Sequence, residues 1–224
     1  WPEIKAERVA EAAALINAAK RPFALVGQGV ILSGAERELK DFLEKADIPA
    51  GTTMLGLSAM PTDFRLNKGM LGMHGNVGPN RKTNECDVLI AIGMRFDDRV
   101  TGDLKTYARQ AKIIHLDIDA SEPDKNVRAD VKVLGDAKAA LRAITAELRP
   151  ARHTAWIAAF DADAEEERVK VIDPELYPTE GRLHMGEIVR RVSEATGHRA
   201  VLVTDVGQNQ MMGVRYFQYT QTRS

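Results

Sequence analysis

Short apolar runs alternate with helix-like segments through the first 148 residues, and this alternation constrains the fold more than any other feature. Strands are predicted at residues 23–26, in "IPAGTT", in "CDVLIAIG", in "AKIIHLDID" and in "ADVKVLGDA". A strand that is apolar at nearly every position is buried on both faces, which is typical of a parallel sheet covered by helices on both sides. The sequence therefore predicts an α/β fold with a doubly wound parallel sheet of five or six strands.

Helices are expected on both faces of this sheet. Segments 1–20 and 136–148 carry apolar residues at helical spacing. Another helix is predicted to begin at Ser33, with Glu36 completing a capping box. The stretch 57–80 is rich in glycine and proline and is expected to be a loop, too long to be an idle connection.

The composition of the chain changes near residue 150. Residues 1–150 are predicted to form one nucleotide-binding domain, and the charged, proline-punctuated segment 151–180 is expected to connect it to a second unit. Residues 181–224 carry a helical pattern in "MGEIVRRVSEATG" and a strand pattern in "RAVLVTDVG". One helix and one strand cannot enclose a core, so this second α/β unit is incomplete, and we expect apolar surface around residues 201–203 to be exposed.

Charge and cysteine content exclude several classes of protein. Lysine and arginine total 31 against 32 acidic residues, so the net charge of −1 argues against a nucleic-acid surface made by bulk charge. No apolar stretch reaches roughly 18 residues, so no membrane span is expected. The single cysteine, Cys86, cannot form an internal disulfide, suggests a reducing compartment and is expected to fill the core.

Glycine and polar residues follow each predicted strand. They are Gly27 to Gly29, Gly51 to Thr53, Gly93 with Arg95, Asp117 with Asp119, and Gly135 with Asp136. In open α/β sheets, ligands bind at the carboxyl ends of the strands, where glycine lets backbone N–H groups approach a phosphate and carboxylates accept hydrogen bonds from ribose. These residues predict a nucleotide cleft.

The run "RFDDRVTG" places two arginines around two aspartates directly after a buried strand. The simplest interpretation is a solvated turn. Its position at a strand end instead favours a site for an anion between Arg95 and Arg99.

Two other patterns bear on the ligand. "GQGVILSG" has its third glycine displaced from the spacing of a nicotinamide dehydrogenase fingerprint, so that function is not predicted. His115 lies inside an apolar strand and is expected to be a core residue. His74 lies in a glycine-rich loop, where a ligand donor and a structural cap are equally good interpretations.

Several stretches in this order resemble one enzyme family. "RPFALVGQGV", "AGTTMLGLSAMP", "MLGMHGNVGPN", "CDVLIAIGMRFDDRVTG", "IIHLDIDASEPDKNV" and "VTDVGQNQMM" are similar to the catalytic large subunits of acetolactate synthases, which are thiamine-diphosphate enzymes of branched-chain amino-acid biosynthesis. The resemblance covers nearly the whole chain, and "RFDDRVTG" is its most specific element. It implies that residues 1–150 are the central, Rossmann-like FAD-binding domain and that 181–224 begin the thiamine-diphosphate domain.

The resemblance also implies roles for individual residues. Arg99 would recognise the carboxylate of the second 2-keto acid, with Asp98 orienting it. A structural FAD that does not turn over, together with the thiamine diphosphate at the far end of the chain, would contact Gly27, Gln28, Gly29, Thr53, Met54, Leu71, Gly72, Met73, His74, Gly93, Arg95, Val100, Asp117, Ile118, Gly135, Asp136, Ala137, Val206, Gly207, Gln208 and Gln210. No metal ligand is assigned, because the family's G-D-G metal loop and its activating glutamate have no counterpart here, so we expect this chain alone to be inactive.

For the full-length enzyme, the resemblance implies thiamine diphosphate, Mg²⁺ and FAD as cofactors. The substrates would be pyruvate and 2-ketobutyrate, and the enzyme would be a homo-oligomer, a dimer or tetramer, with or without a regulatory small subunit, in the cytoplasm of a bacterium or in a plastid or mitochondrion of a eukaryote. Two alternatives stay open. One is another thiamine-diphosphate enzyme, of the glyoxylate carboligase, pyruvate oxidase or oxalyl-CoA decarboxylase type. The other is a non-catalytic module that binds flavin or ADP.

Overall fold

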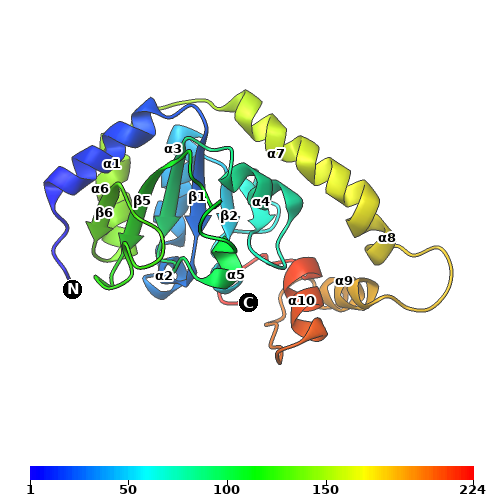
Figure 1. Cartoon of the computed structure of the whole chain (residues 1–224). Helices are drawn as coiled ribbons and strands as arrows, with labels where there is room; N and C mark the ends of the chain where they lie inside the picture. The colour runs from blue at the N-terminus through cyan, green and yellow to red at the C-terminus, as the bar shows by residue number, and fades with distance from the viewer.

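A computed structural model describes all 224 residues and has a single six-stranded sheet at its centre (Figure 1). The strands are β1 (Pro22–Val26), β2 (Ala50–Thr52), β3 (Asn67–Met70), β4 (Val88–Ile92), β5 (Lys112–Asp117) and β6 (Val131–Leu134). Their order is β3-β2-β1-β4-β5-β6, and every neighbouring pair is parallel. The predicted doubly wound fold is confirmed, and its strand order reverses direction between β1 and β4, which is where such sheets open a ligand crevice.

Two apolar clusters lie on opposite faces of the sheet. Successive strand residues point to opposite faces, so Ala24 and Ile90 belong to one cluster while Phe23 and Leu89 belong to the other. The first cluster is covered by α1 (Ala6–Ala18), α3 (Glu36–Ala46) and α6 (Ala137–Glu147). The short helices α2 (Gln28–Leu32), η1 (Met54–Gly56), α4 (Val77–Thr83) and α5 (Asp98–Thr101) lie in the connections.

The segment predicted as a connector is mostly helical and also contributes to the core. It forms α7 (Thr154–Glu167), a π-helical turn (Arg168–Ile172) and α8 (Asp173–Leu176). Trp156 and Phe160 of α7 are buried in the second apolar cluster. The indole of Trp156 donates to the carbonyl of Pro22 at 2.9 Å, and the rings of Phe160 and Phe23 are 5.0 Å apart. The first half of α7 therefore covers the second face of the sheet.

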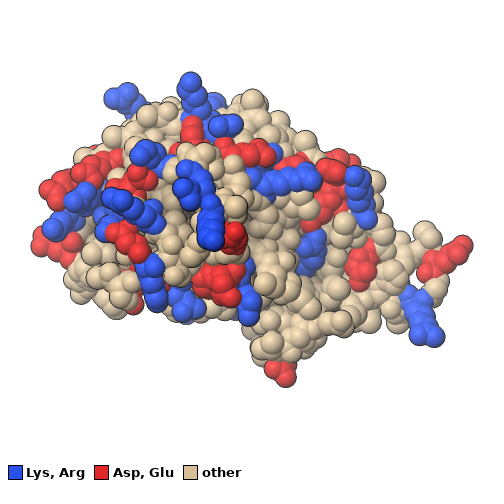
Figure 2. Space-filling view, viewed as in Figure 1, with Lys and Arg blue, Asp and Glu red and all other residues tan.

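The C-terminal residues form a small helical unit at the far end of α7 and α8 (Figure 1). It contains α9 (Met185–Ala195) and α10 (Gln208–Tyr216), which pack against each other. The chain then returns to the central domain, where the backbone of Tyr219 bonds to Thr62. No helix is both long enough and apolar enough to span a bilayer. Acidic and basic side chains are interspersed over the face seen in Figure 2.

Three details of the predicted secondary structure are wrong. Segment 57–80 contains β3 and the first half of α4, which its glycines concealed. Ser33 ends α2 instead of capping α3, because Gly34 turns the chain with a φ of 59° and α3 begins one residue after Ala35. Residues 199–206 form no strand, since no neighbouring strand lies beside them to pair with. The expected apolar exposure there is confirmed, with Val201 64% and Val203 87% exposed.

A buried carboxylate gives the central domain a pH-dependent stability. Burial raises the pKa of Glu38, but hydrogen bonds from its own backbone N–H, from Arg142 and from Arg37 outweigh burial and lower it to about 2. Because the pKa is lower in the folded chain than its usual 4.5, the resulting stability is present above about pH 4.5 and is lost as the pH falls towards 2.

We expect Glu38→Gln to remove the loss of stability that protonation of Glu38 causes at low pH. The free energy of unfolding of the unsubstituted chain should fall between pH 5 and pH 2 by about 2–3 kcal/mol more than that of the variant. Urea titrations at both pH values measure the difference. Glu44→Gln is the control, because Glu44 is an exposed partner of Lys40 on the same helix. If the free energy of unfolding falls equally with pH in the Glu38 variant and in the unsubstituted chain, the lowered pKa of Glu38 is contradicted.

Candidate functional site

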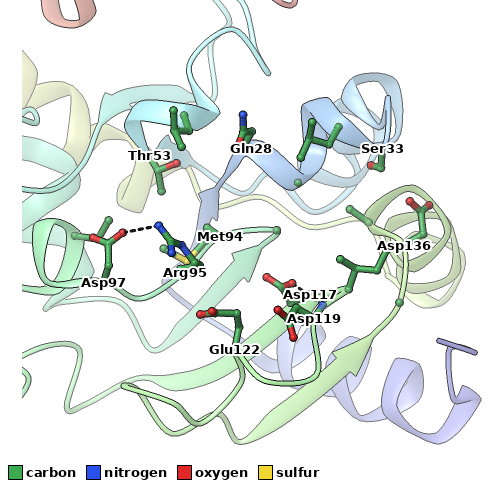
Figure 3. A pocket seen from close by; sticks show the side chains of 18 of the residues that line it. Gln28, Ser33, Thr53, Met94, Arg95, Asp97, Asp117, Asp119, Glu122 and Asp136 are labelled. Carbon is green, nitrogen blue, oxygen red and sulfur yellow. Dashed lines mark hydrogen bonds and ion pairs between the residues drawn. The ribbon is translucent and has the colours of Figure 1, made fainter. Parts of the chain in front are cut away.

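A cavity of about 720 Å³ lies at the carboxyl ends of the strands (Figure 3). Residues at or after the end of every strand except β3 line this cavity. Those residues are Gln28 and Gly29 after β1, Thr53 and Met54 after β2, Gly93, Met94 and Arg95 after β4, Asp117 and Ile118 at the end of β5, and Gly135 to Ala137 after β6. This size is typical of cofactor and small-molecule sites. The cavity occupies the crevice expected at the reversal of strand order.

Close packing of two loops explains the glycines on one side of the cavity. A Cβ on Gly27 would lie 2.2 Å from the carbonyl oxygen of Gly93, and one on Gly29 would lie 2.6 Å from the Gly93 Cα. The N–H groups of Gly27 and Gly29 donate to the carbonyls of Ile92 and Gly93, both at 2.9 Å. We predicted that N–H groups here would approach a phosphate, but these two are already used to join the β1 and β4 loops.

The charged run after β4 forms an exposed pair of arginines with acidic partners. Arg95 lies 3.9 Å from Asp97, and Arg99 lies 3.4 Å from Asp98. The Asp97 carboxylate also accepts the Arg99 backbone N–H at 3.0 Å, which starts α5. The side chains of Arg95 and Arg99 are 65% and 71% exposed, and ion pairs this exposed add little stability. Stability therefore does not account for this cluster, and most guanidinium donors remain free for a ligand.

Carboxylates surround the other part of the cavity. Asp117, Asp119 and Glu122 line one side of it and Asp136 lies at the end away from Arg95 (Figure 3). Asp136 accepts the N–H of Ala139 and so caps α6. Hydrogen bonds from the backbone and hydroxyl of Ser121 hold the pKa of Asp119 below its usual range. Arg95 thus lies at one end of the cavity beside Asp97, and further carboxylates extend to the opposite end at Asp136 (Figure 3).

Thirteen of the predicted site residues line this cavity. They are Gln28, Gly29, Thr53, Met54, Gly93, Arg95, Arg99, Val100, Asp117, Ile118, Gly135, Asp136 and Ala137. Gly27 and Asp98 lie directly beside lining residues without lining the cavity themselves.

The loop Leu71–His74 lies behind the cavity wall instead of in it. The N–H of Met73 donates to the carbonyl of Arg99 at 2.8 Å, and a Cβ on Gly72 would lie 2.7 Å from the same oxygen. Of the C-terminal residues, Gln210 lines a neighbouring cavity that shares Gln28 and Met54 with this one. Val206, Gly207 and Gln208 are exposed and line neither.

Sequence reasoning missed several lining residues. They are Trp1, Leu32, Ser33, Leu55, Met94, Asp97 and Glu122. Asp97 lay within the quoted charged run, but only the backbone after β4 decides that Asp97, and not Asp98, faces the cavity. Glu122 lies in an irregular loop five residues beyond β5, and no periodicity in the sequence marks it.

The predicted core residues lie where expected. Cys86 is buried, and burial raises the pKa of its thiol to about 12. His115 is fully buried, its Nε2 lies 2.9 Å from the carbonyl of Met94, and its ring packs edge-on against Phe96 at 5.1 Å. No three His, Cys, Asp or Glu side chains are grouped so that they could hold a metal ion.

Comparison with known proteins identifies the family. Residues 9–144 match the model of the thiamine pyrophosphate enzyme central domain. The chain belongs to the thiamine pyrophosphate enzyme family. The matched residues include the whole six-stranded sheet. The sheet therefore corresponds to the central domain of this family, and the cavity lies at the carboxyl ends of its strands.

Curated relatives of this thiamine pyrophosphate enzyme carry one kind of name. This chain is 40% identical over 97% of its length to the "Probable acetolactate synthase large subunit" of Methanocaldococcus jannaschii, and it covers 37% of that protein. It is also 40% identical over 97% of its length to the "Acetolactate synthase" of Mycobacterium bovis, covering 35%. With "Probable acetolactate synthase 2, chloroplastic" of Oryza sativa subsp. japonica it shares 38% identity over 93% of its length, covering 32%. The chain spans about a third of the length of these relatives.

Proposed function

We propose that this chain is the FAD-binding part of an acetolactate synthase large subunit, which decarboxylates pyruvate and joins it to a second 2-keto acid. The observation that carries the proposal is the cavity at the carboxyl ends of the sheet, lined by two arginines and by several carboxylates, in a chain similar over nearly its whole length to proteins named acetolactate synthase.

The cavity suits the two chemically different parts of FAD. Ribose hydroxyls are hydrogen-bond donors, and Asp117 and Asp119 offer acceptors on the cavity wall. The diphosphate and the electron-rich edge of the flavin ring need donors, and Arg95 offers them nearby (Figure 3). The flavin would be structural, as the family resemblance implies, so these residues would bind and orient it without moving electrons.

Arg99 is proposed to recognise the acceptor keto acid. Arg99 lines the cavity, its side chain is 71% exposed, and its guanidinium has one long contact, to Asp98. A planar carboxylate can receive two parallel N–H bonds from one guanidinium, which fixes its orientation as well as its position. Asp98, beside it, would limit the rotamers that the Arg99 side chain adopts.

Other parts of the enzyme would supply the remaining chemistry. We assign residues 1–150 to the central domain, 151–180 to the connection and 181–224 to the start of the thiamine-diphosphate domain, with Val206 to Gln210 approaching that cofactor. Thiamine diphosphate, when bound, stabilises the carbanion left by decarboxylation. Mg²⁺ would be held outside these residues, since no side-chain cluster here fits it. We propose pyruvate and 2-ketobutyrate as substrates and a homo-oligomer as the active form. Whether a regulatory small subunit is present, and in which compartment the enzyme lies, would depend on the source organism.

The first test of this proposal is flavin binding by the purified chain. FAD should bind in a titration that follows quenching of flavin fluorescence, and Arg95→Ala should raise its Kd by about 10-fold, since a charged hydrogen bond is worth roughly 1.5–3 kcal/mol. Arg109→Ala is a matched control, because Arg109 is an exposed arginine whose guanidinium bonds only to the Lys105 carbonyl. ADP that binds as tightly as FAD would favour the nucleotide-module alternative, and an unchanged Kd for the Arg95 variant would contradict the site.

A second test concerns turnover. We expect the 224-residue chain with thiamine diphosphate, Mg²⁺, FAD and pyruvate to form no acetolactate above a control without protein, because activation of thiamine needs a carboxylate and a metal held in one geometry. A colorimetric acetolactate assay measures this directly. Turnover above the control would show that the catalytic groups have been assigned to the wrong part of the enzyme.

A further inference from the structure

Glu167, at the end of α7, holds several segments together. Its side chain is only 3% exposed. One carboxylate oxygen accepts the backbone N–H of Val77 at 3.0 Å and the amide of Asn76 at 3.3 Å, at the start of α4. The other oxygen bonds to the guanidinium of Arg215 on α10. The π-helical turn begins at the next residue, and irregular turns of this kind are frequent at functional positions.

Arg215 carries this contact from the C-terminal unit into the loop behind the cavity. Its side chain is 17% exposed, and besides Glu167 it donates to the carbonyls of Gly75 at 3.0 Å and His74 at 3.3 Å. A guanidinium can make these bonds at once because its N–H groups form a planar fork. Arg215 is thus a tie between α10 and the loop 71–77.

The same loop contacts the wall of the cavity. The Met73 N–H bonds to the carbonyl of Arg99 at 2.8 Å, and Gly72 approaches that oxygen so closely that a side chain would not fit. Arg99 and Val100 line the cavity. One short series of contacts therefore joins the side chains of Glu167 and Arg215, through the backbone of residues 72–75, to the backbone of Arg99 in the cavity wall.

We propose that Arg215, held by Glu167, is a positioning residue that fixes the cavity wall at Arg99 and couples that wall to the placement of α10. The segment Val206–Gln210, proposed to approach thiamine diphosphate, includes the first turn of α10. Seating this C-terminal unit on the central domain would then set the position of the acceptor-binding arginine. This meaning for catalysis rests on the proposed function, whereas the coupling itself does not.

Amide hydrogen exchange of the chain tests the coupling without any ligand. Removing one charge would leave the other buried and unpaired, so the variant is the double substitution Glu167→Gln with Arg215→Met. Exchange in segments 71–75 and 97–101 should become roughly 3- to 30-fold faster, the range that couplings through side-chain networks produce. Exchange in β4 and β5 should not change. Unchanged exchange at 97–101, or an equal rise in the strands, would overturn the proposal.

Two further variants separate positioning from general loss of structure. Glu187→Gln with Arg191→Met removes another ion pair of the same C-terminal unit, whose carboxylate is buried and whose N–O distance is 2.7 Å, and should leave segment 97–101 unaffected. Arg215→Lys keeps the charge beside Glu167 but cannot form the fork to both carbonyls, so it should give an intermediate rate at 97–101. It also decides the question if the double variant does not fold, because a rate equal to that of the unsubstituted chain would refute the role of the fork.

Flavin titration distinguishes failure of this inference from failure of the proposed function. The double variant should bind FAD several-fold more weakly than the unsubstituted chain, because the wall that includes Arg99 and Val100 is displaced. If the unsubstituted chain binds no FAD, the proposed function fails and the exchange rates still decide the coupling. If it binds FAD and segment 97–101 exchanges at its normal rate in the double variant, the coupling is refuted and the proposed function stands.

Discussion

Gly27→Ala is expected to lower the free energy of unfolding by about 2–4 kcal/mol, because overpacking a rigid site costs about 1–3 kcal/mol and a broken hydrogen bond about 1 kcal/mol more. The added Cβ would lie 2.2 Å from the carbonyl oxygen of Gly93 and 2.4 Å from the Cβ of Met94. The loops after β1 and β4 would have to separate, which would break the bond from the Gly27 N–H to Ile92. Because these loops meet beneath the cavity, flavin binding should be lost as well.

Gly78→Ala is the matched control for this substitution. Gly78 lies in α4, and the nearest atom to its added Cβ would be the Asp163 Cβ at 3.6 Å, an ordinary contact. Alanine favours helix over glycine, so stability should stay the same or rise by up to about 1 kcal/mol. Urea titrations compare the two variants. If both glycines accept alanine equally well, the close approach of the β1 and β4 loops is not a feature of the folded protein.

Arg99→Met should separate the two halves of the proposed reaction. In the intact enzyme we expect acetolactate formation to fall about 100-fold, because two charged hydrogen bonds to the acceptor carboxylate are worth at least 2.7 kcal/mol together. Decarboxylation of the first pyruvate should fall much less, since the acceptor carboxylate is absent from that step. Carbon dioxide release within the first turnover and acetolactate formation at steady state give the two rates, because at steady state one carbon dioxide accompanies each acetolactate.

Arg99→Lys and Arg109→Met complete this experiment. Lysine keeps the positive charge but not the planar fork, so it should restore only part of the transfer rate. Arg109 does not line the cavity, and its loss should change neither rate. Equal losses of both rates in Arg99→Met would indicate that Arg99 supports the structure of the site instead of binding the acceptor.

The sheet was predictable because burial on both faces leaves a strong local pattern. β1 and β4 are apolar at every residue and β5 carries the buried run "IIHL", so each was predicted within one or two residues. β3 was missed because its sequence, "NKGM", is neither apolar nor alternating, and it pairs as an edge strand through its backbone. The strand predicted at 199–207 shows the reverse error, because an apolar run forms a strand only where a partner is present to bond with it.

The cavity was predictable only as far as strand ends define it. Gly93, Arg95 and Asp117 directly follow or end predicted strands, and all three line the cavity. The contacts made by Glu167 and Arg215 could not be predicted, because these residues lie 48 positions apart and meet only after α7 and α10 are placed. Long-range packing of this kind leaves no periodic signal in a single sequence.

The burial of Trp156 and Phe160 has a practical consequence for dissecting this protein. A truncated domain that ended at residue 150 would leave the ring of Phe23 without its partner and the Pro22 carbonyl without its indole donor. Such a fragment would expose an apolar face and would be prone to aggregate during expression. A plasmid encoding the sheet alone should therefore extend through α7, and because Glu167 also anchors the start of α4, it should end no earlier than the π-helical turn.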